Sequence, residues 1–176
     1  MFAQRSDVGA VGAMLYYPDD TIQHAGVCIG LGGVAGHFFV GKNKNDPGYM
    51  WRLNFAQNMS AVTGACMLMR REIWDTLGGL NENYAVAFND ADLCMRIRNA
   101  GWLIVWTPFA KLYHFESKSR GEEDTPEKER RFNDEVCYFK KCWAKELETG
   151  DPYYNPNLSL TFPDFCPVDI RPHDAR

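Results

Sequence analysis

The sequence lacks the signals that mark zinc-bound, membrane-spanning and nucleic-acid-binding proteins. Its six cysteines form no C-x-x-C pair, so we expect no structural zinc site. It has no apolar run of about 18 residues and no basic leader, so we expect neither a transmembrane helix nor a signal peptide. Its formal net charge of −4 argues against a nucleic-acid partner, because phosphate binding needs a basic face. Unpaired cysteines fit a reducing cytoplasm, with a peripheral membrane role left open.

The composition is that of a folded domain. The chain has 176 residues, which is enough for one domain with a substantial core. Hydrophobic residues make up 45% and aromatic residues 14%, which excludes a disordered chain. We expect one domain over residues 1–149 and a proline-rich extended tail over 150–176. An apolar strand pattern begins almost at Met1, so we expect the chain to be a piece of a longer protein.

Short apolar segments predict the strands of a sheet. Residues 8–17 read as a buried strand, and the turn at 18–21 leads into a second extended segment over 22–31, so the two predict a hairpin. Residues 65–69 and 102–108 predict two more buried strands, the second ended by Pro108. Residues 32–50 show no periodicity and predict a long loop anchored by Phe38 and Phe39.

Three helices alternate with these strands. Residues 70–79 predict a short helix that packs through Ile73, Trp74 and Leu77 and ends at Gly78 or Gly79. The segment from Asn89 to Ala100 predicts a second helix, whose apolar residues are Leu93, Ile97 and Ala100.

A third helix should start after a cap at Asp124 or Thr125, with Pro126 in its first turn. We expect its charged residues to face solvent and its apolar face to comprise Phe132, Val136, Phe139, Trp143 and Leu147. Mixed helices and buried strands predict an α/β fold with a mixed sheet and flanking helices.

Two carboxylates, Asp90 and Asp92, stand at the start of the second helix. Asn89 can serve as its N-cap, and acids in a first turn gain about 0.3–1 kcal/mol from the helix dipole. Capping needs only one side chain, however, and three polar residues compete for this single helix start. The alternative is that the pair reaches a sheet edge, where α/β folds bind ligands.

Residues 110–117 predict a shorter extended piece that carries His114, and this residue has two interpretations. It lies between Tyr113 and Phe115, so it can simply pack in an aromatic neighbourhood. Alternatively, its neutral imidazole can be a ligand for a divalent metal ion.

The segment "VTGACMLMRREIWDTLGGLNENYAVAFNDADLCMRIRNAGWLIVWTPFAKLYHFESKSRG" resembles the C-terminal, acceptor-side half of family 2 glycosyltransferases of the GT-A fold. A T-G-A-C strand, a G-G-L-N-E turn, a D-x-D-L-C-x-R helix start and an H-x-x-S-x-S-R-G element follow in family order. "VGAVGAMLYYPDDTIQHAGVCIG" and "DPYYNPNLSL" resemble bacterial members, so the similarity covers nearly the whole chain.

The resemblance implies an inverting transfer of sugar from a nucleotide diphosphate to an acceptor hydroxyl, on a glycan or a lipid-linked molecule. An alcohol is a weak nucleophile, so a carboxylate must accept its proton, and the resemblance places Asp90 in that position. The family often has Glu-Asp there, whereas this chain has Asn89 before Asp90. Asp92 is then expected to orient substrate or to cap the helix.

The resemblance also implies a metal and a sugar pocket. His114 matches a position that helps to hold Mn²⁺ or Mg²⁺, which would neutralise the leaving diphosphate. Lys118 and Arg120 are expected either to contact phosphate oxygens or to be solvated charges. The segment matched to the sugar pocket comprises Thr63, Gly64 and Ala65. Trp51, beside Arg52, is expected either to stack on a sugar or to anchor its loop.

The N-terminal, nucleotide-binding half of the family is absent from this sequence, and so is its metal-binding D-x-D motif after a strand. We therefore expect the chain alone to be an inactive fragment of an enzyme, one that can dimerise through an exposed sheet edge. The rivals are a non-catalytic carbohydrate- or partner-binding module and a structural domain whose acids only cap a helix.

Overall fold

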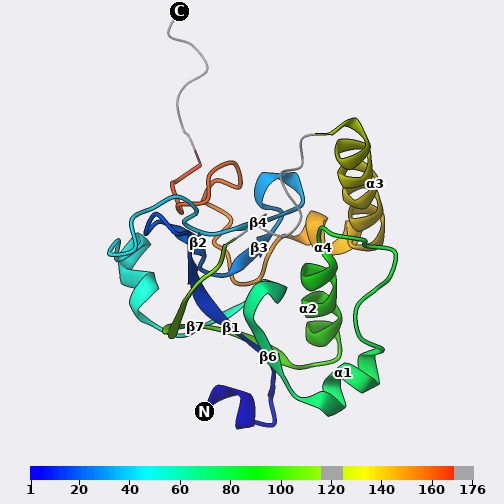
Figure 1. Cartoon of the computed structure of the whole chain (residues 1–176), viewed down its shortest axis with the longest axis horizontal. Helices are drawn as coiled ribbons and strands as arrows, with labels where there is room; N and C mark the ends of the chain where they lie inside the picture. The colour runs from blue at the N-terminus through cyan, green and yellow to red at the C-terminus, as the bar shows by residue number, and fades with distance from the viewer. Residues whose placement is uncertain (116–124, 169–176) are drawn as a thin grey trace, which may run out of the picture.

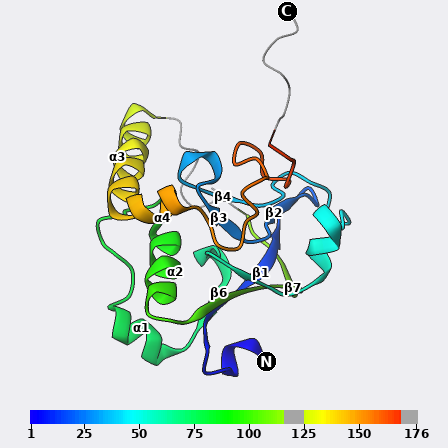
Figure 2. The same cartoon turned by 180° about the vertical axis from the view of Figure 1, so that it is seen from behind.

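The computed structural model describes residues 1–115 and 125–168. Within this part of the chain, a mixed five-stranded sheet forms the centre (Figure 1, Figure 2), and its strands are β1 (Val8–Tyr16), β2 (Ile22–His24), β5 (Gln57–Met59), β6 (Met67–Met69) and β7 (Leu103–Tyr113). A two-stranded sheet pairs β3 (Val27–Ile29) with β4 (Ala35–His37). The helices are α1 (Arg71–Leu77), α2 (Asn89–Asn99), α3 (Pro126–Cys142) and α4 (Ala144–Thr149). The expected α/β class, a mixed sheet with flanking helices, is confirmed.

Strand β1 is the centre of the larger sheet. Strand β7 runs parallel to it along one edge, and β5 pairs antiparallel with β7. The other edge of β1 is shared by β6 and β2, which both run antiparallel to it. Strand β1 is buried along nearly its whole length, as its apolar sequence predicts.

Helix α2 packs directly against β1 and β7. Gly9 allows this approach, because a Cβ there would lie only 2.3 Å from Cγ2 of Ile97. Leu93 and Ile97 are buried as predicted, whereas Ala100 lies just past the helix end and is exposed. The chain therefore enters β7 directly beneath α2, and the helix start with Asp90 is fixed relative to the sheet.

The hairpin prediction is correct only for its first half. Strand β2 pairs with β1, but the chain leaves the sheet at Gly26. The φ of Gly26 is 99°, a positive value that glycine adopts more readily than other residues. Strand β3 then pairs with β4 in the smaller sheet instead of continuing β2.

Two strand predictions are wrong in detail. Strand β7 does not end at Pro108 but continues to Tyr113, because its pairing with β1 shifts register between Thr107 and Lys111. This irregularity accommodates a residue that has no N–H to donate. The expected buried strand at 65–69 is a 3₁₀ turn (Gly64–Cys66) followed by β6, which is partly exposed because it lies at the sheet edge.

The helix ends follow local sequence signals more closely. Gly78 caps α1 in the left-handed conformation, and the Thr125 hydroxyl accepts a hydrogen bond from the Lys128 amide at the start of α3. Two predictions for α3 fail. Glu135 is buried instead of solvated, and its exposed fraction is only 4%. Phe132, which we expected on the buried face, is 44% exposed.

The segment 150–168 packs onto the smaller sheet and the loop after it. The ring of Phe165 lies 4.5 Å from that of Phe38 and 5.1 Å from that of Phe39, centroid to centroid. The Phe39 amide also donates a hydrogen bond to the carbonyl of Pro163. Phe38 and Phe39 thus anchor their loop as predicted. In the described part of the chain, no helix is both long and apolar enough to cross a membrane.

Candidate active site

A pocket of about 680 Å³ opens where the 3₁₀ turn, α1, α2 and the end of β7 meet. Its lining combines polar residues from the 3₁₀ turn, the start of α2 and the segment after β7 with apolar residues from β6, α1 and the loop after α1, which we call the apolar wall. The lining residues are Thr63, Gly64, Ala65, Met67, Leu68, Met69, Trp74, Leu80, Val86, Asn89, Asp90, Leu93, His114 and Phe115. Asp90 therefore shares this pocket with four other site residues predicted from the sequence, which are Thr63, Gly64, Ala65 and His114.

Asp90 both lines the pocket and stabilises the start of α2. Its Oδ1 accepts a hydrogen bond from the Ala91 amide and its Oδ2 accepts one from the Gly64 amide, each at 2.8 Å. A carboxylate has roughly four acceptor sites, so two bonds leave capacity on both oxygens. Asn89 is not the N-cap as we expected, because Phe88 takes that position with φ 62° and ψ 2°.

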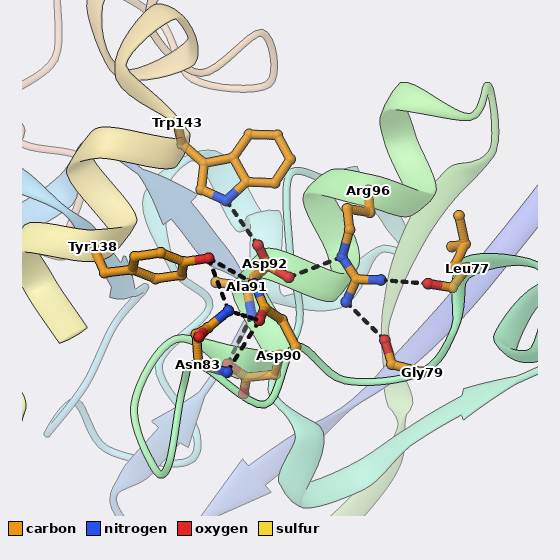
Figure 3. A network of polar contacts seen from close by, with 10 residues as sticks. Leu77, Gly79, Asn83, Asp90, Ala91, Asp92, Arg96, Tyr138 and Trp143 are labelled. Atoms are coloured by element: carbon orange, nitrogen blue, oxygen red, sulfur yellow. Dashed lines mark hydrogen bonds and ion pairs between the residues drawn. The ribbon is translucent and has the colours of Figure 1, made fainter.

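Asp92 does not reach the pocket. Its exposed fraction is 3%, and its carboxylate accepts hydrogen bonds from Arg96 Nε at 2.8 Å and Trp143 Nε1 at 3.1 Å (Figure 3). Arg96 in turn donates to the carbonyls of Leu77 and Gly79, each at 2.8 Å. These bonds come from side chains and not from amides of the helix start, so Asp92 does not cap α2; it ties α2 to Trp143, just after α3, and through Arg96 to the end of α1.

The 3₁₀ turn is held from both sides. The Thr63 hydroxyl accepts a hydrogen bond from the Ala65 amide, so it closes the turn itself. The Thr63 amide donates to Nε2 of His24, on β2, at 3.4 Å. Burial, and then the nearby His37, hold the pKa of His24 well below 6.5, so its ring is neutral and can accept this bond.

His114 is oriented by a second residue of β2. Its Nδ1 lies 2.9 Å from Oε1 of Gln23, and its backbone amide donates to the Tyr16 carbonyl. An amide oxygen can only accept, so in the neutral ring Nδ1 carries the proton and Nε2 keeps its lone pair. Gln23 and His24 were not predicted as site residues. The signal available in the sequence was two polar residues inside an apolar strand.

The other predicted residues lie elsewhere. Trp51 is in the 3₁₀ segment Tyr49–Asn54, is 66% exposed and does not line the pocket. Arg52 lies over the ring of Phe165, at 4.8 Å from its centroid. Lys118 and Arg120 lie outside the described residues.

The described residues offer only part of a metal site. Across 1–115 and 125–168, no group of three or more His, Cys, Asp or Glu side chains could hold a metal ion. His114 and Asp90 line the same pocket. A divalent ion there would need further oxygen ligands from outside these residues.

The mixed sheet, the flanking helices and the acidic helix start beside the T-G-A-C turn define part of a GT-A-like fold. The family described as glycosyltransferase-like family 2 matches residues 39–131, just over half of the chain. The chain belongs to this family.

Three relatives extend the comparison. Uncharacterized protein y4gI of Sinorhizobium fredii is 58% identical over 93% of this chain, and O-antigen biosynthesis protein RfbC of Myxococcus xanthus is 37% identical over 98%. An N-acetylglucosaminyl-diphospho-decaprenol L-rhamnosyltransferase of Mycobacterium tuberculosis is 37% identical over 35% of the chain. The chain spans only 18%, 13% and 20% of these relatives, respectively. No solved structure matches the chain significantly.

Proposed function

We propose that the complete protein is an inverting glycosyltransferase in which Asp90 is the general base. In this reaction the acceptor hydroxyl attacks the anomeric carbon, its proton passes to Asp90, and the bond from that carbon to the nucleoside diphosphate breaks. The observation that carries the proposal is the carboxylate of Asp90, fixed by two backbone amides in the same pocket as His114. A base whose position is fixed needs little reorganisation before it accepts a proton.

We propose that His114 supplies one ligand to Mn²⁺ or Mg²⁺. Its fit rests on the bond to Gln23, which leaves Nε2 as the unprotonated nitrogen. When bound, the ion would neutralise charge on the departing diphosphate. The remaining ligands would come from that diphosphate and from the nucleotide-binding half of the complete protein.

The substrates follow from the family and from the names of two relatives. A nucleotide-diphosphate sugar is the proposed donor. An O-antigen biosynthesis protein and a transferase whose name specifies a diphospho-decaprenol acceptor both align with this chain, so we propose a glycan or lipid-linked acceptor. None of the six cysteines forms a disulfide, which fits a cytoplasmic site for this reaction.

The test is an Asp90→Asn variant of the complete protein. We expect sugar transfer to fall about 100- to 10,000-fold, the range of a general base, while donor binding stays within about twofold. Asp75→Asn is the matched control, since Asp75 is an exposed acid of α1 that pairs with Arg71. Transfer at the wild-type rate by the Asp90 variant would exclude this residue as base. The 176-residue chain alone should show no transfer.

A non-catalytic carbohydrate-binding module is the second candidate, favoured by the apolar wall of the pocket. Such a module would bind saccharide equally well in wild-type and Asp90→Asn forms, and neither form of the complete protein would transfer sugar.

A further inference from the structure

The pocket has an aromatic side chain that the sequence analysis assigned to the core. Trp74 of α1 is 36% exposed and lines the same pocket as Asp90 and His114. Trp51, which we expected to stack on a sugar, is outside that lining. Of these two tryptophans, only Trp74 can therefore contact a ligand that also reaches Asp90.

The indole of Trp74 is held by close packing on Gly79. A Cβ at position 79 would lie 2.9 Å from Cζ2, 3.0 Å from Cε2 and 3.3 Å from Nε1 of the indole. Gly79 also has φ 72°, so both its conformation and its neighbour require glycine. The ring thus rests on bare backbone, which limits its motion.

The backbone under the indole is itself fixed by the ion pair next to the candidate base. Arg96 donates to the Gly79 carbonyl, and Asp92 on the same helix holds Arg96 (Figure 3). Asp92 lies two residues after Asp90. The backbone under the aromatic ring is therefore tied to α2, the helix whose first turn carries the candidate base.

The chemistry around Trp74 selects a neutral ligand. The apolar wall of this pocket includes Met67, Leu68, Met69 and Leu80 together with Trp74. Asp90 is the only Asp, Glu, Lys or Arg among the described lining residues. This wall suits neither a diphosphate nor another anion. A sugar ring has one face of C–H groups, which suits the negative face of an aromatic ring, and hydroxyls at its edge for the polar groups opposite.

We propose that Trp74 is the platform on which the acceptor sugar stacks, with its hydroxyl directed to Asp90. The inference rests on the proposed transferase function and adds a binding subsite to it. A prenyl or acyl chain is the competing occupant of an apolar wall. The two differ in one respect: a sugar needs the aromatic face, whereas a hydrocarbon chain needs only apolar surface.

The test measures saccharide binding by the 176-residue chain with saturation-transfer NMR titrations. The probes are methyl β-D-glucopyranoside, methyl α-L-rhamnopyranoside and the prenyl alcohol geraniol. We expect saturable binding of at least one glycoside, with a Kd on the order of millimolar for so small a ligand. Trp74→Leu should weaken it about three- to tenfold, because leucine keeps the apolar surface but removes the aromatic face.

Matched variants separate stacking from misfolding. Trp74→Phe should keep glycoside affinity within about twofold, and Trp51→Leu should leave it unchanged. Gly79→Ala should weaken binding without altering Trp74 itself, because the new Cβ displaces the indole. Equal glycoside affinity in Trp74→Leu and wild type would overturn the proposal. The proposal would also be overturned if geraniol binds and Trp74→Leu retains that binding, or if no glycoside binds at all.

The proposed transfer reaction stands or falls separately. Glycoside binding by this chain tests the platform through Trp74, while transfer by the Asp90→Asn variant of the complete protein tests the base. Glycoside binding that depends on Trp74, together with undiminished transfer by the Asp90 variant, would refute the base and retain the platform.

Discussion

Replacing Glu135 by glutamine should loosen the segment that leads into Asp90. The carboxylate of Glu135, on α3, accepts three backbone hydrogen bonds from this segment: Oε1 from Ala85 and Val86 at 2.8 and 3.0 Å, and Oε2 from Ala87 at 2.8 Å. Glutamine keeps one oxygen for the first two amides but turns an NH₂ group toward the amide of Ala87. One hydrogen bond becomes a contact between two donors, and the other two are made to a neutral acceptor instead of a charged one.

The size of the effect follows from these three bonds. A bond to a charged group contributes about 1.5–3 kcal/mol and a neutral one about 0.5–1.5 kcal/mol, so each retained bond loses roughly 1 kcal/mol. The third leaves a donor unsatisfied, which costs about 1–3 kcal/mol when it is buried. The bond from Ala87 is only partly buried, so its donor costs about 1 kcal/mol, and because Ala85 is exposed, water also recovers part of the loss there. We expect the free energy of unfolding to fall by about 2–3 kcal/mol.

Urea unfolding and amide hydrogen exchange measure this prediction. The amides of Ala85, Val86 and Ala87 should be protected in the wild type and exchange faster in Glu135→Gln. Asp134→Asn is the control, since Asp134 is an exposed acid on the same helix and should change stability by less than about 0.5 kcal/mol. The reasoning is refuted if Glu135→Gln unfolds like the control and these three amides exchange at wild-type rates.

Three further predictions concern the groups behind the pocket. The pKa of His24 lies below 6.5 in the folded chain, so as the pH falls the unfolded chain binds the proton first. The contribution of His24 to the free energy of unfolding should be full above pH 6.5. In urea unfolding, this free energy should fall by about 1.4 kcal/mol from pH 7.5 to 5.5. His24→Gln should lose most of that slope, and an unchanged slope would contradict the assignment. Gln23→Leu removes the acceptor for Nδ1 of His114, so the population of the tautomer protonated at Nε2 should rise, as ¹⁵N NMR would show. An unaltered tautomer ratio counts against the role of Gln23. Burial raises the pKa of the Cys94 thiol to about 12. A disulfide reagent at pH 8 should therefore label the exposed Cys137 at once and Cys94 only on unfolding, which mass spectrometry of the labelled peptides would show. Early labelling of Cys94 would mean that this part of the core opens.

Part of the candidate site could be predicted from the sequence because it lies on short stretches of chain. Asp90 sits in the first turn of a helix whose apolar period is local, and Thr63, Gly64 and Ala65 are consecutive. The resemblance then placed both stretches in one site, and the structure brings them together through the bond from the Gly64 amide to Asp90. The residues that orient the site were missed, because Gln23 contacts His114 across 91 positions of sequence.

The sequence by itself determined the elements whose causes are local. The glycine after α1 ends that helix because it adopts the left-handed conformation, and the Thr125 hydroxyl caps α3 through an amide three residues away. The apolar run of β1 made it the buried centre of the sheet. Each of these outcomes depends on neighbours within a few residues, which a sequence pattern records.

Only the tertiary structure decided what the charged and aromatic side chains do. Glu135 lies on a helix rich in charge, and Trp74 on a helix with an apolar stripe, so their patterns predicted a solvated acid and a core residue. In the fold, α3 brings Glu135 onto three amides of a distant loop, and Trp74 lines an open pocket together with residues of β6 and α2. The free energy of a buried charge or an exposed ring depends on what packs against it, and the periodicity of its own segment does not contain that information.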